Sequence, residues 1–162
     1  MDSQPVFLAD AAATARLGRD LAAGWLALPA GARPVLLLQG DLGAGKTSLV
    51  QGIAAALGIE EPVTSPSFAL AQHYRGRCGA RGATALVHLD LYRLEQPAAA
   101  DELFAQEEEE ALAEGALLAV EWPSRLSFVP EGAWQLALAL ADPADPERGR
   151  MAWLSGIEPP QG

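Results

Sequence analysis

One glycine-rich segment constrains the fold of this chain more than any other feature. Residues Gly40–Thr47 read Gly-Asp-Leu-Gly-Ala-Gly-Lys-Thr and match the pattern G-x-x-x-x-G-K-[ST]. The short apolar run Val35–Gln39 precedes them, as expected of a buried parallel strand. An apolar stripe at helical spacing follows, so a helix is expected over Lys46–Leu57. A strand, a glycine loop and a helix in this order predict a phosphate-binding loop, or P-loop.

The residue types of this loop suit phosphate chemistry. Glycines let backbone N–H groups turn inward around phosphate oxygens, and the following helix adds the positive end of its dipole. Lys46 is the only lysine beside ten arginines, and its compact ammonium fits between phosphate oxygens where a guanidinium does not. The Thr47 hydroxyl is expected to ligate Mg²⁺. The predicted nucleotide-binding residues of the loop are Gly40, Asp41, Leu42, Gly43, Ala44, Gly45, Lys46, Thr47 and Ser48.

Two carboxylates follow apolar strands at the positions where a P-loop protein needs one. Asp90 follows the predicted strand Thr84–Leu89, and Glu121 follows the predicted strand Ala116–Val120. An acidic residue at the end of a neighbouring strand holds the metal directly or through water. A solvated strand end is the alternative for either residue. Lys46, Asp90 and Glu121 are therefore the predicted catalytic residues.

The nucleotide itself is partly predictable. Guanine recognition in GTPases usually uses an Asn-Lys-x-Asp motif, whereas this chain has no asparagine and its one lysine lies in the loop. ATP is therefore favoured over GTP. The segment Thr64–Phe68 follows at the distance of a switch loop, where the Ser65 and Ser67 hydroxyls are candidates to meet the γ-phosphate or its metal. An ordinary proline turn at Pro66 is the alternative.

Length and pattern predict the fold class. The chain has 162 residues, half of them apolar, which suits one domain over 1–162. Strands that alternate with helices predict an α/β fold, a P-loop NTPase-like three-layer sandwich with a largely parallel central sheet. The other predicted elements are strands over Pro5–Ala9, Phe68–Tyr74, Trp134–Leu140 and Met151–Leu154, and helices from Asp10 to Leu28 and over Pro97–Glu114.

Charge and composition restrict the partners. A net charge of −10 argues against direct binding to nucleic acid, so any such role is expected to run through a partner. One cysteine, Cys78, excludes an internal disulfide, and no apolar run is long enough to span a membrane. The helical stripe over Leu17–Leu28 favours a core helix over a signal peptide. We expect a cytoplasmic protein that is monomeric when alone and does not contact membranes.

Four motifs in order resemble the TsaE family, the ATPases of bacterial tRNA threonylcarbamoyladenosine biosynthesis. They read GDLGAGKT, SPSF, HLDLYRL and EWP, at residues 40–47, 65–68, 88–94 and 121–123. The resemblance implies a subunit that hydrolyses ATP weakly alone and is stimulated by TsaB and TsaD, with tRNA reached only through that complex. It also implies that Thr47 and Glu121 hold Mg²⁺ and that Asp90 lies near the phosphates and is essential. Trp122 and residues 65–68 would line or support the site.

The sequence departs from the family pattern in places that spare this chemistry. Ser67 and Ser48 replace threonines and keep a hydroxyl. The basic insert Arg75–Gly82 is interpreted as a mobile hairpin tip, with a partner contact or an RNA contact as alternatives. His73 and His88 lack metal-ligand neighbours in the sequence and are interpreted as structural. A small-molecule kinase and a non-catalytic nucleotide-binding adaptor remain as rival functions.

Overall fold

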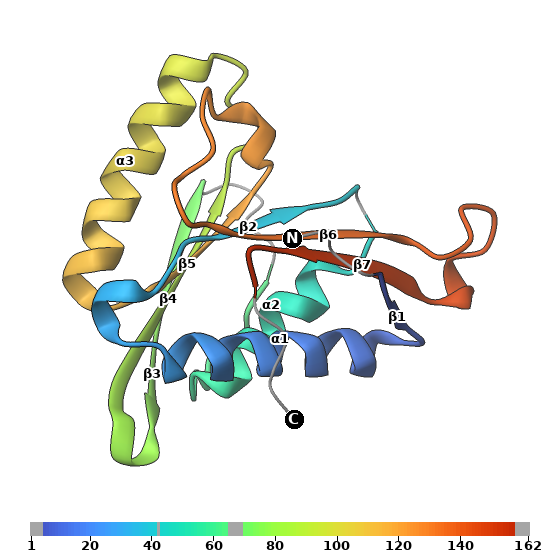
Figure 1. Cartoon of the computed structure of the whole chain (residues 1–162), viewed down its shortest axis with the longest axis horizontal. Coiled ribbons are helices and arrows are strands. Elements are labelled where there is room, and N and C mark those ends of the chain that lie inside the picture. The colour runs from blue at the N-terminus through green and yellow to red at the C-terminus, as the bar shows by residue number, and fades with distance from the viewer. Residues whose placement is uncertain (1–4, 42, 65–69, 158–162) are drawn as a thin grey trace.

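The fold is a seven-stranded sheet with three α-helices (Figure 1). The computed structural model describes residues 5–41, 43–64 and 70–157. The strands lie side by side in the order β1-β7-β6-β2-β5-β4-β3. The strands are β1 (Val6–Leu8), β2 (Leu36–Gln39), β3 (Ala71–Cys78), β4 (Gly82–Asp90), β5 (Leu117–Glu121), β6 (Trp134–Leu140) and β7 (Arg150–Ser155). The helices are α1 (Ala11–Ala27), α2 (Lys46–Ala56) and α3 (Pro97–Glu114), with short 3₁₀ turns at Ala30–Ala32, Gly79–Arg81, Pro123–Arg125 and Pro146–Arg148.

The sheet is mixed, which corrects the prediction of a largely parallel one. Its four central strands are parallel, because β2 pairs with both β5 and β6, and β5 pairs with β4. The edges are antiparallel: β3 on β4, β7 on β6 and β1 on β7. The physical reason is that β3–β4 and β6–β7 are joined by short turns, which return the chain antiparallel to itself. Because the central strands are parallel, the C-terminal ends of β2, β4 and β5 lie on the same side of the sheet.

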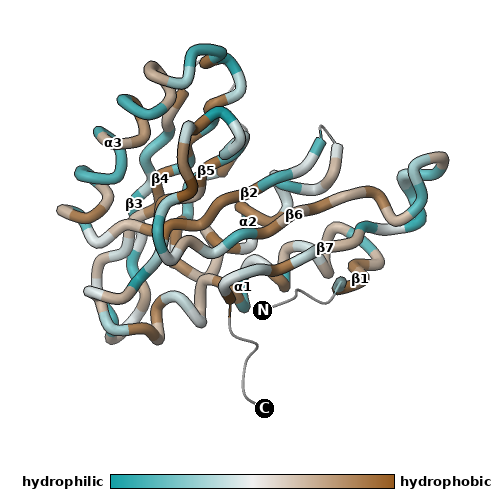
Figure 2. The backbone as a smooth tube through the Cα atoms, turned by 45° about the horizontal axis from the view of Figure 1, so that its top comes forward, coloured by the Kyte–Doolittle hydropathy of each residue, from teal (hydrophilic) through white to brown (hydrophobic). Residues whose placement is uncertain are grey.

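Helices cover both faces of the sheet. One core packs α1 and α2 against the sheet, and the other packs α3 against the opposite face (Figure 1). Strand β2 supplies both cores, because Leu36 and Leu38 point to the first and Leu37 to the second. The central strands are accordingly apolar, while α3 carries many hydrophilic residues (Figure 2). No helix in residues 5–41, 43–64 and 70–157 is long and apolar enough to cross a membrane.

Two glycines let α1 and α2 cross at close range. A Cβ on Gly18 would lie 2.1 Å from the carbonyl oxygen of Leu49, and a Cβ on Gly52 would lie 1.9 Å from that of Ala15. Backbone therefore packs directly on backbone at this crossing. Because α2 begins at the end of the P-loop, α1 fixes the position of the helix on which the phosphate site depends.

The insert Arg75–Gly82 is mostly paired strand, which corrects its interpretation as a mobile tip. Residues from Arg75 to Cys78 extend β3 against β4, and only Gly79–Arg81 forms the turn. The turn is tied down, since Arg81 Nη1 donates to the carbonyl oxygen of Leu26 at 2.7 Å. Cys78 Sγ likewise donates to the carbonyl oxygen of Ala56 at 2.8 Å. The insert thus braces the ends of α1 and α2.

Candidate functional site

The P-loop connects β2 to α2 as the sequence predicted. Strand β2 ends at Gln39 and α2 begins at Lys46. Gly43 and Gly45 have φ of 85° and 102°, in the left-handed region that glycine adopts without strain. Gly45 is the N-cap of α2, and no side chain caps the helix there. The positive end of the α2 dipole therefore lies at the end of the P-loop.

Lys46 and Glu121 meet at the centre of the site. Lys46 Nζ lies 3.2 Å from Glu121 Oε1, and both side chains are nearly buried. The contact follows from topology, because β2 and β5 are adjacent parallel strands with Leu38 opposite Glu121. The second carboxylate oxygen, Oε2, hydrogen-bonds to Nε2 of His88. A buried carboxylate thus lies between a lysine and a histidine.

The charge of Glu121 is stabilised by its partners. Burial alone raises the pKa of this carboxyl, because it disfavours the charged form. The hydrogen bond from His88 and the charges of His88 and Lys46 lower the pKa by more, so it lies below the ordinary glutamate value. Glu121 is therefore an anion under physiological conditions and is suited to hold a cation.

His88 is a site residue that the sequence interpretation missed. The sequence shows no metal-ligand neighbours for His88 and indicates a structural role, whereas in the structure only 1% of the residue is exposed and its imidazole contacts Glu121. The available signal was its place in the apolar run Thr84–Leu89, since a buried polar group needs a partner. Its Nδ1 is buried, with no hydrogen-bond partner among the described residues.

Asp90 lies beside Glu121, as the sequence predicted for two strand ends. The two residues are opposite each other in the parallel pairing of β4 with β5. Asp90 is half-buried, and its Oδ1 accepts a hydrogen bond from the Tyr92 amide at 2.9 Å. The carboxylate is thus held at the strand end by the turn that follows it.

Trp122 has an unusual backbone beside this pair. Its φ of 58° is the one positive value among the described non-glycine residues, and such conformations concentrate at functional sites. Its ring packs on Tyr92 at a centroid distance of 4.8 Å, and Lys46 Nζ lies 5.5 Å from the ring centroid. Arg125 lies over both rings, 5.7 Å from Tyr92 and 5.6 Å from Trp122.

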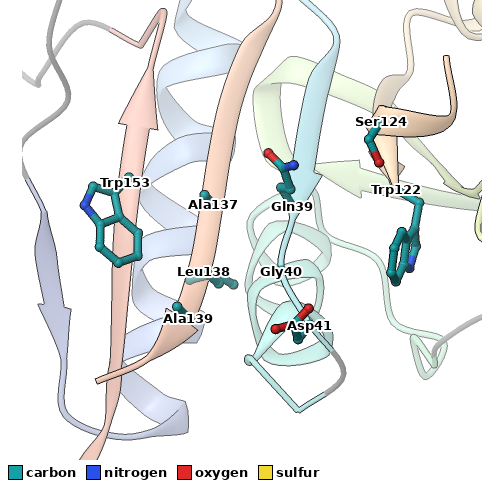
Figure 3. Close-up of a pocket in the computed structure, with 9 residues that line it drawn as sticks. All are labelled: Gln39, Gly40, Asp41, Trp122, Ser124, Ala137, Leu138, Ala139 and Trp153. Atoms are coloured by element: carbon teal, nitrogen blue, oxygen red, sulfur yellow. The ribbon is translucent and has the colours of Figure 1, made fainter. Parts of the chain in front are cut away.

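An open pocket of about 240 Å³ borders the start of the P-loop (Figure 3). Trp122 and Trp153 stand on its two sides, and the small side chains of Ala137 and Ala139 on β6 leave room between them (Figure 3). Gly40 and Asp41 of the P-loop reach this space. The wall from β6 and β7 was not predicted, because its apolar residues alternate like any half-buried strand. The lining residues are Gln39, Gly40, Asp41, Trp122, Ser124, Ala137, Leu138, Ala139 and Trp153.

Comparisons with known proteins show the family of this chain. A family model described as "Threonylcarbamoyl adenosine biosynthesis protein TsaE" matches residues 8–149. The chain belongs to the TsaE family. It is 44% identical over 132 residues to a protein from Synechocystis sp. named "tRNA threonylcarbamoyladenosine biosynthesis protein TsaE", covering 80% of this chain and 76% of that protein. Proteins of the same name from Nostoc sp. and Mycobacterium tuberculosis are 41% and 43% identical, covering 85% and 69% of this chain and 78% and 61% of theirs.

The resemblance seen in the four motifs is therefore confirmed at the level of the TsaE family. Three predicted nucleotide contacts, Leu42, Ser65 and Ser67, lie outside the described residues, so their roles stay predictions. Thr47 and Ser48 lie in the first turn of α2, both half-buried. The site lies at the C-terminal ends of the central parallel strands, where the structure brings together the P-loop with Lys46 and the residues Asp90, Glu121 and Trp122.

Proposed function

We propose that this chain binds and hydrolyses ATP with magnesium to support threonylcarbamoyladenosine formation on tRNA. The names of its relatives support the pathway, and the site supports the nucleotide chemistry. The observation that carries the proposal is the ion pair of Lys46 with Glu121 at 3.2 Å beside the uncapped N-terminus of α2. A cation, a carboxylate and the positive end of a helix are three elements of a nucleotide-triphosphate site.

The residues present fit a triphosphate. The N-terminus of α2 carries the positive end of the helix dipole, and the first turn of α2 contains no acidic residue that would repel an anion. A Cβ at Gly43 would meet no atom of the described residues within 4 Å, so none of them fills the space on that side of the loop. With a nucleotide bound, the Lys46 ammonium would pair with the β- and γ-phosphate oxygens in place of Glu121.

The residues present also fit magnesium. A hydroxyl from Thr47 and a carboxylate from Glu121 are the hard oxygen ligands that Mg²⁺ prefers. When bound, magnesium neutralises charge on the phosphate oxygens. Glu121 would be a ligand of the bound ion in place of its contact with Lys46, and His88 would keep the carboxylate oriented.

Hydrolysis needs a positioned water molecule. Water attacks the γ-phosphorus, the bond to the β–γ bridging oxygen breaks, and ADP and phosphate leave with one proton. Asp90, next to Glu121 in the sheet, either orients this water or couples the site to a partner. Lys46 stabilises charge on the phosphate oxygens during transfer.

We propose TsaB and TsaD as the partners, with tRNA reached only through that complex. The net charge of −10 opposes direct docking on a polyanion. A catalytic element supplied in trans by these partners would complete the site. The isolated monomer is accordingly a slow ATPase.

Nucleotide binding by the full chain tests this proposal. Calorimetric titration should show ATP binding that magnesium strengthens, and GTP should bind more weakly. Asp90→Ala should keep much of this binding and lose turnover. Equal binding of ATP to wild type and Lys46→Ala, each with a native circular dichroism spectrum, would overturn the assignment of the P-loop as the nucleotide site.

A further inference from the structure

A second cluster of metal-ligating side chains lies between β3 and α3. His73 Nε2 is 3.0 Å from Glu107 Oε2 and 4.0 Å from Glu110 Oε2. One ligand atom from each residue lies within 4.8 Å of the other two. We propose that His73, Glu107 and Glu110 form a binding site for a divalent transition-metal ion, with zinc as the ion that this chemistry favours.

The fold creates this arrangement from segments far apart in sequence. His73 projects from β3 on the side opposite to Tyr74, which is buried in the core with α1 and α2. Glu107 and Glu110 are three residues apart on α3, so they lie on one face of the helix. The strand therefore supplies one ligand and the helix two. This geometry was not expected from the sequence, in which His73 has no metal-ligand neighbours.

A second observation concerns the carboxylate of Glu107 in this cluster. Its Oε2 is buried and has no hydrogen-bond partner in the described part of the chain. This Oε2 is the atom that lies 3.0 Å from His73 Nε2 in the ion-pair contact. A buried carboxylate oxygen without a hydrogen bond is costly, and a metal ion within reach of all three ligands would satisfy it.

The ligand types select among metals. Imidazole nitrogen with two carboxylates suits zinc and its neighbours, whereas Mg²⁺ and Ca²⁺ prefer oxygen alone. Glu110 is more than half exposed and His73 about one third exposed, so an ion can enter from solvent and a water molecule can complete a tetrahedral set. The next pair along the same elements, Arg75 with Glu114 at 3.2 Å, is an ordinary surface ion pair and offers a comparison.

Zinc titration of the tag-free full chain without nucleotide tests the proposal. Competition with a chromogenic chelator, in excess Mg²⁺ to occupy the nucleotide site, should show one zinc ion per chain. His73→Ala and the nearly isosteric Glu107→Gln should each weaken zinc binding at least tenfold. Glu109→Gln, an exposed neighbour on α3, and Cys78→Ser, which removes the only thiol, should bind zinc like wild type. Zinc should also raise the melting temperature of wild type but not of His73→Ala.

Three outcomes would overturn the proposal. The first is no zinc binding at micromolar concentrations. The second is zinc binding that His73→Ala and Glu107→Gln leave unchanged, which would place the ion elsewhere. The third is that His73→Ala lowers the melting temperature but zinc changes the melting temperature of no variant, wild type included. This result would show that the cluster is an ion pair and not a metal site. Circular dichroism of each variant separates these results from loss of the fold.

Discussion

Lys46 Nζ and Glu121 Oε1 are 3.2 Å apart, so the only lysine of the chain is paired with the carboxylate proposed to hold magnesium. The ammonium of Lys46 and the carboxylate of Glu121 thus neutralise each other in the site proposed for phosphate and magnesium. Nucleotide and magnesium entering together replace one ion pair by two new contacts. This exchange predicts that the two ligands bind cooperatively.

Glu121→Gln tests that exchange. Without the carboxylate, Lys46 is no longer held and the metal loses a ligand. ATP binding with magnesium should weaken by about 10–100-fold, the range seen when metal-site residues are altered, whereas magnesium-free binding should be unchanged or tighter. Titration calorimetry with and without EDTA measures both values. Equal losses under the two conditions would show that Glu121 does not act through the metal.

The ionisation of Glu121 should contribute to the pH dependence of the free energy of unfolding. Its pKa in the folded protein lies below the ordinary value, so the ionised group contributes stability above the unfolded-state pKa. That contribution is lost as the pH falls through the folded-state pKa. In urea denaturation the free energy of unfolding should therefore fall with acid more steeply in wild type than in Glu121→Gln. One group limits the difference in slope to about 1.4 kcal/mol per pH unit, and parallel curves would contradict the stabilised charge.

Two substitutions of His88 should distinguish the effect of its hydrogen bond to Glu121 from the effect of the volume that its side chain fills. His88→Leu fills the space but cannot donate to Glu121, and it leaves a buried carboxylate oxygen unsatisfied. His88→Gln keeps a donor. Turnover and magnesium affinity should fall in His88→Leu by roughly 10-fold or more, with partial recovery in His88→Gln. Equal values in the two variants would mean that His88 serves packing alone.

The crossing of α1 and α2 should reject any side chain at Gly52. A Cβ there would lie 1.9 Å from the carbonyl oxygen of Ala15, so Gly52→Ala must push the helices apart. Overpacking of this kind costs about 1–3 kcal/mol, and nucleotide affinity should fall because α2 carries the P-loop. Gly24→Ala is the matched control on α1: its nearest neighbour would be 3.9 Å away, and alanine in a helix interior gains up to about 1 kcal/mol. Denaturant midpoints and slopes measure both, and an unchanged midpoint in Gly52→Ala would refute the close crossing.

The parts of the fold that the sequence predicted are those governed by local patterns. Composition alone predicts helix α3 over its observed range, and the structure shows that Pro97 begins the helix and Gly115, at a φ of 67°, ends it. The P-loop and the strand-end carboxylates were likewise predictable from a motif and from apolar runs that end in an acid.

The parts that were missed depend on contacts between distant segments. The insert after Arg75 has the composition of a mobile loop, yet it is held by carbonyl oxygens of α1 and α2 that no local pattern reveals. The roles of His88 and His73 also depend on pairing across strands and onto a helix. The sequence places both histidines on predicted strands, but it does not identify the side chains that they contact.

Steady-state ATP hydrolysis by wild type and Lys46→Ala, each alone and with TsaB and TsaD, tests the central claim most directly. Lys46 is the one cation of the P-loop, so the account predicts slow turnover by the wild type alone and a severalfold or greater increase on adding the partners. Lys46→Ala and Lys46→Arg should show no increase, since neither places a compact charge between the phosphates. Circular dichroism should show both variants folded. Hydrolysis by folded Lys46→Ala that equals wild type, or a wild-type rate indifferent to TsaB and TsaD, would contradict the account.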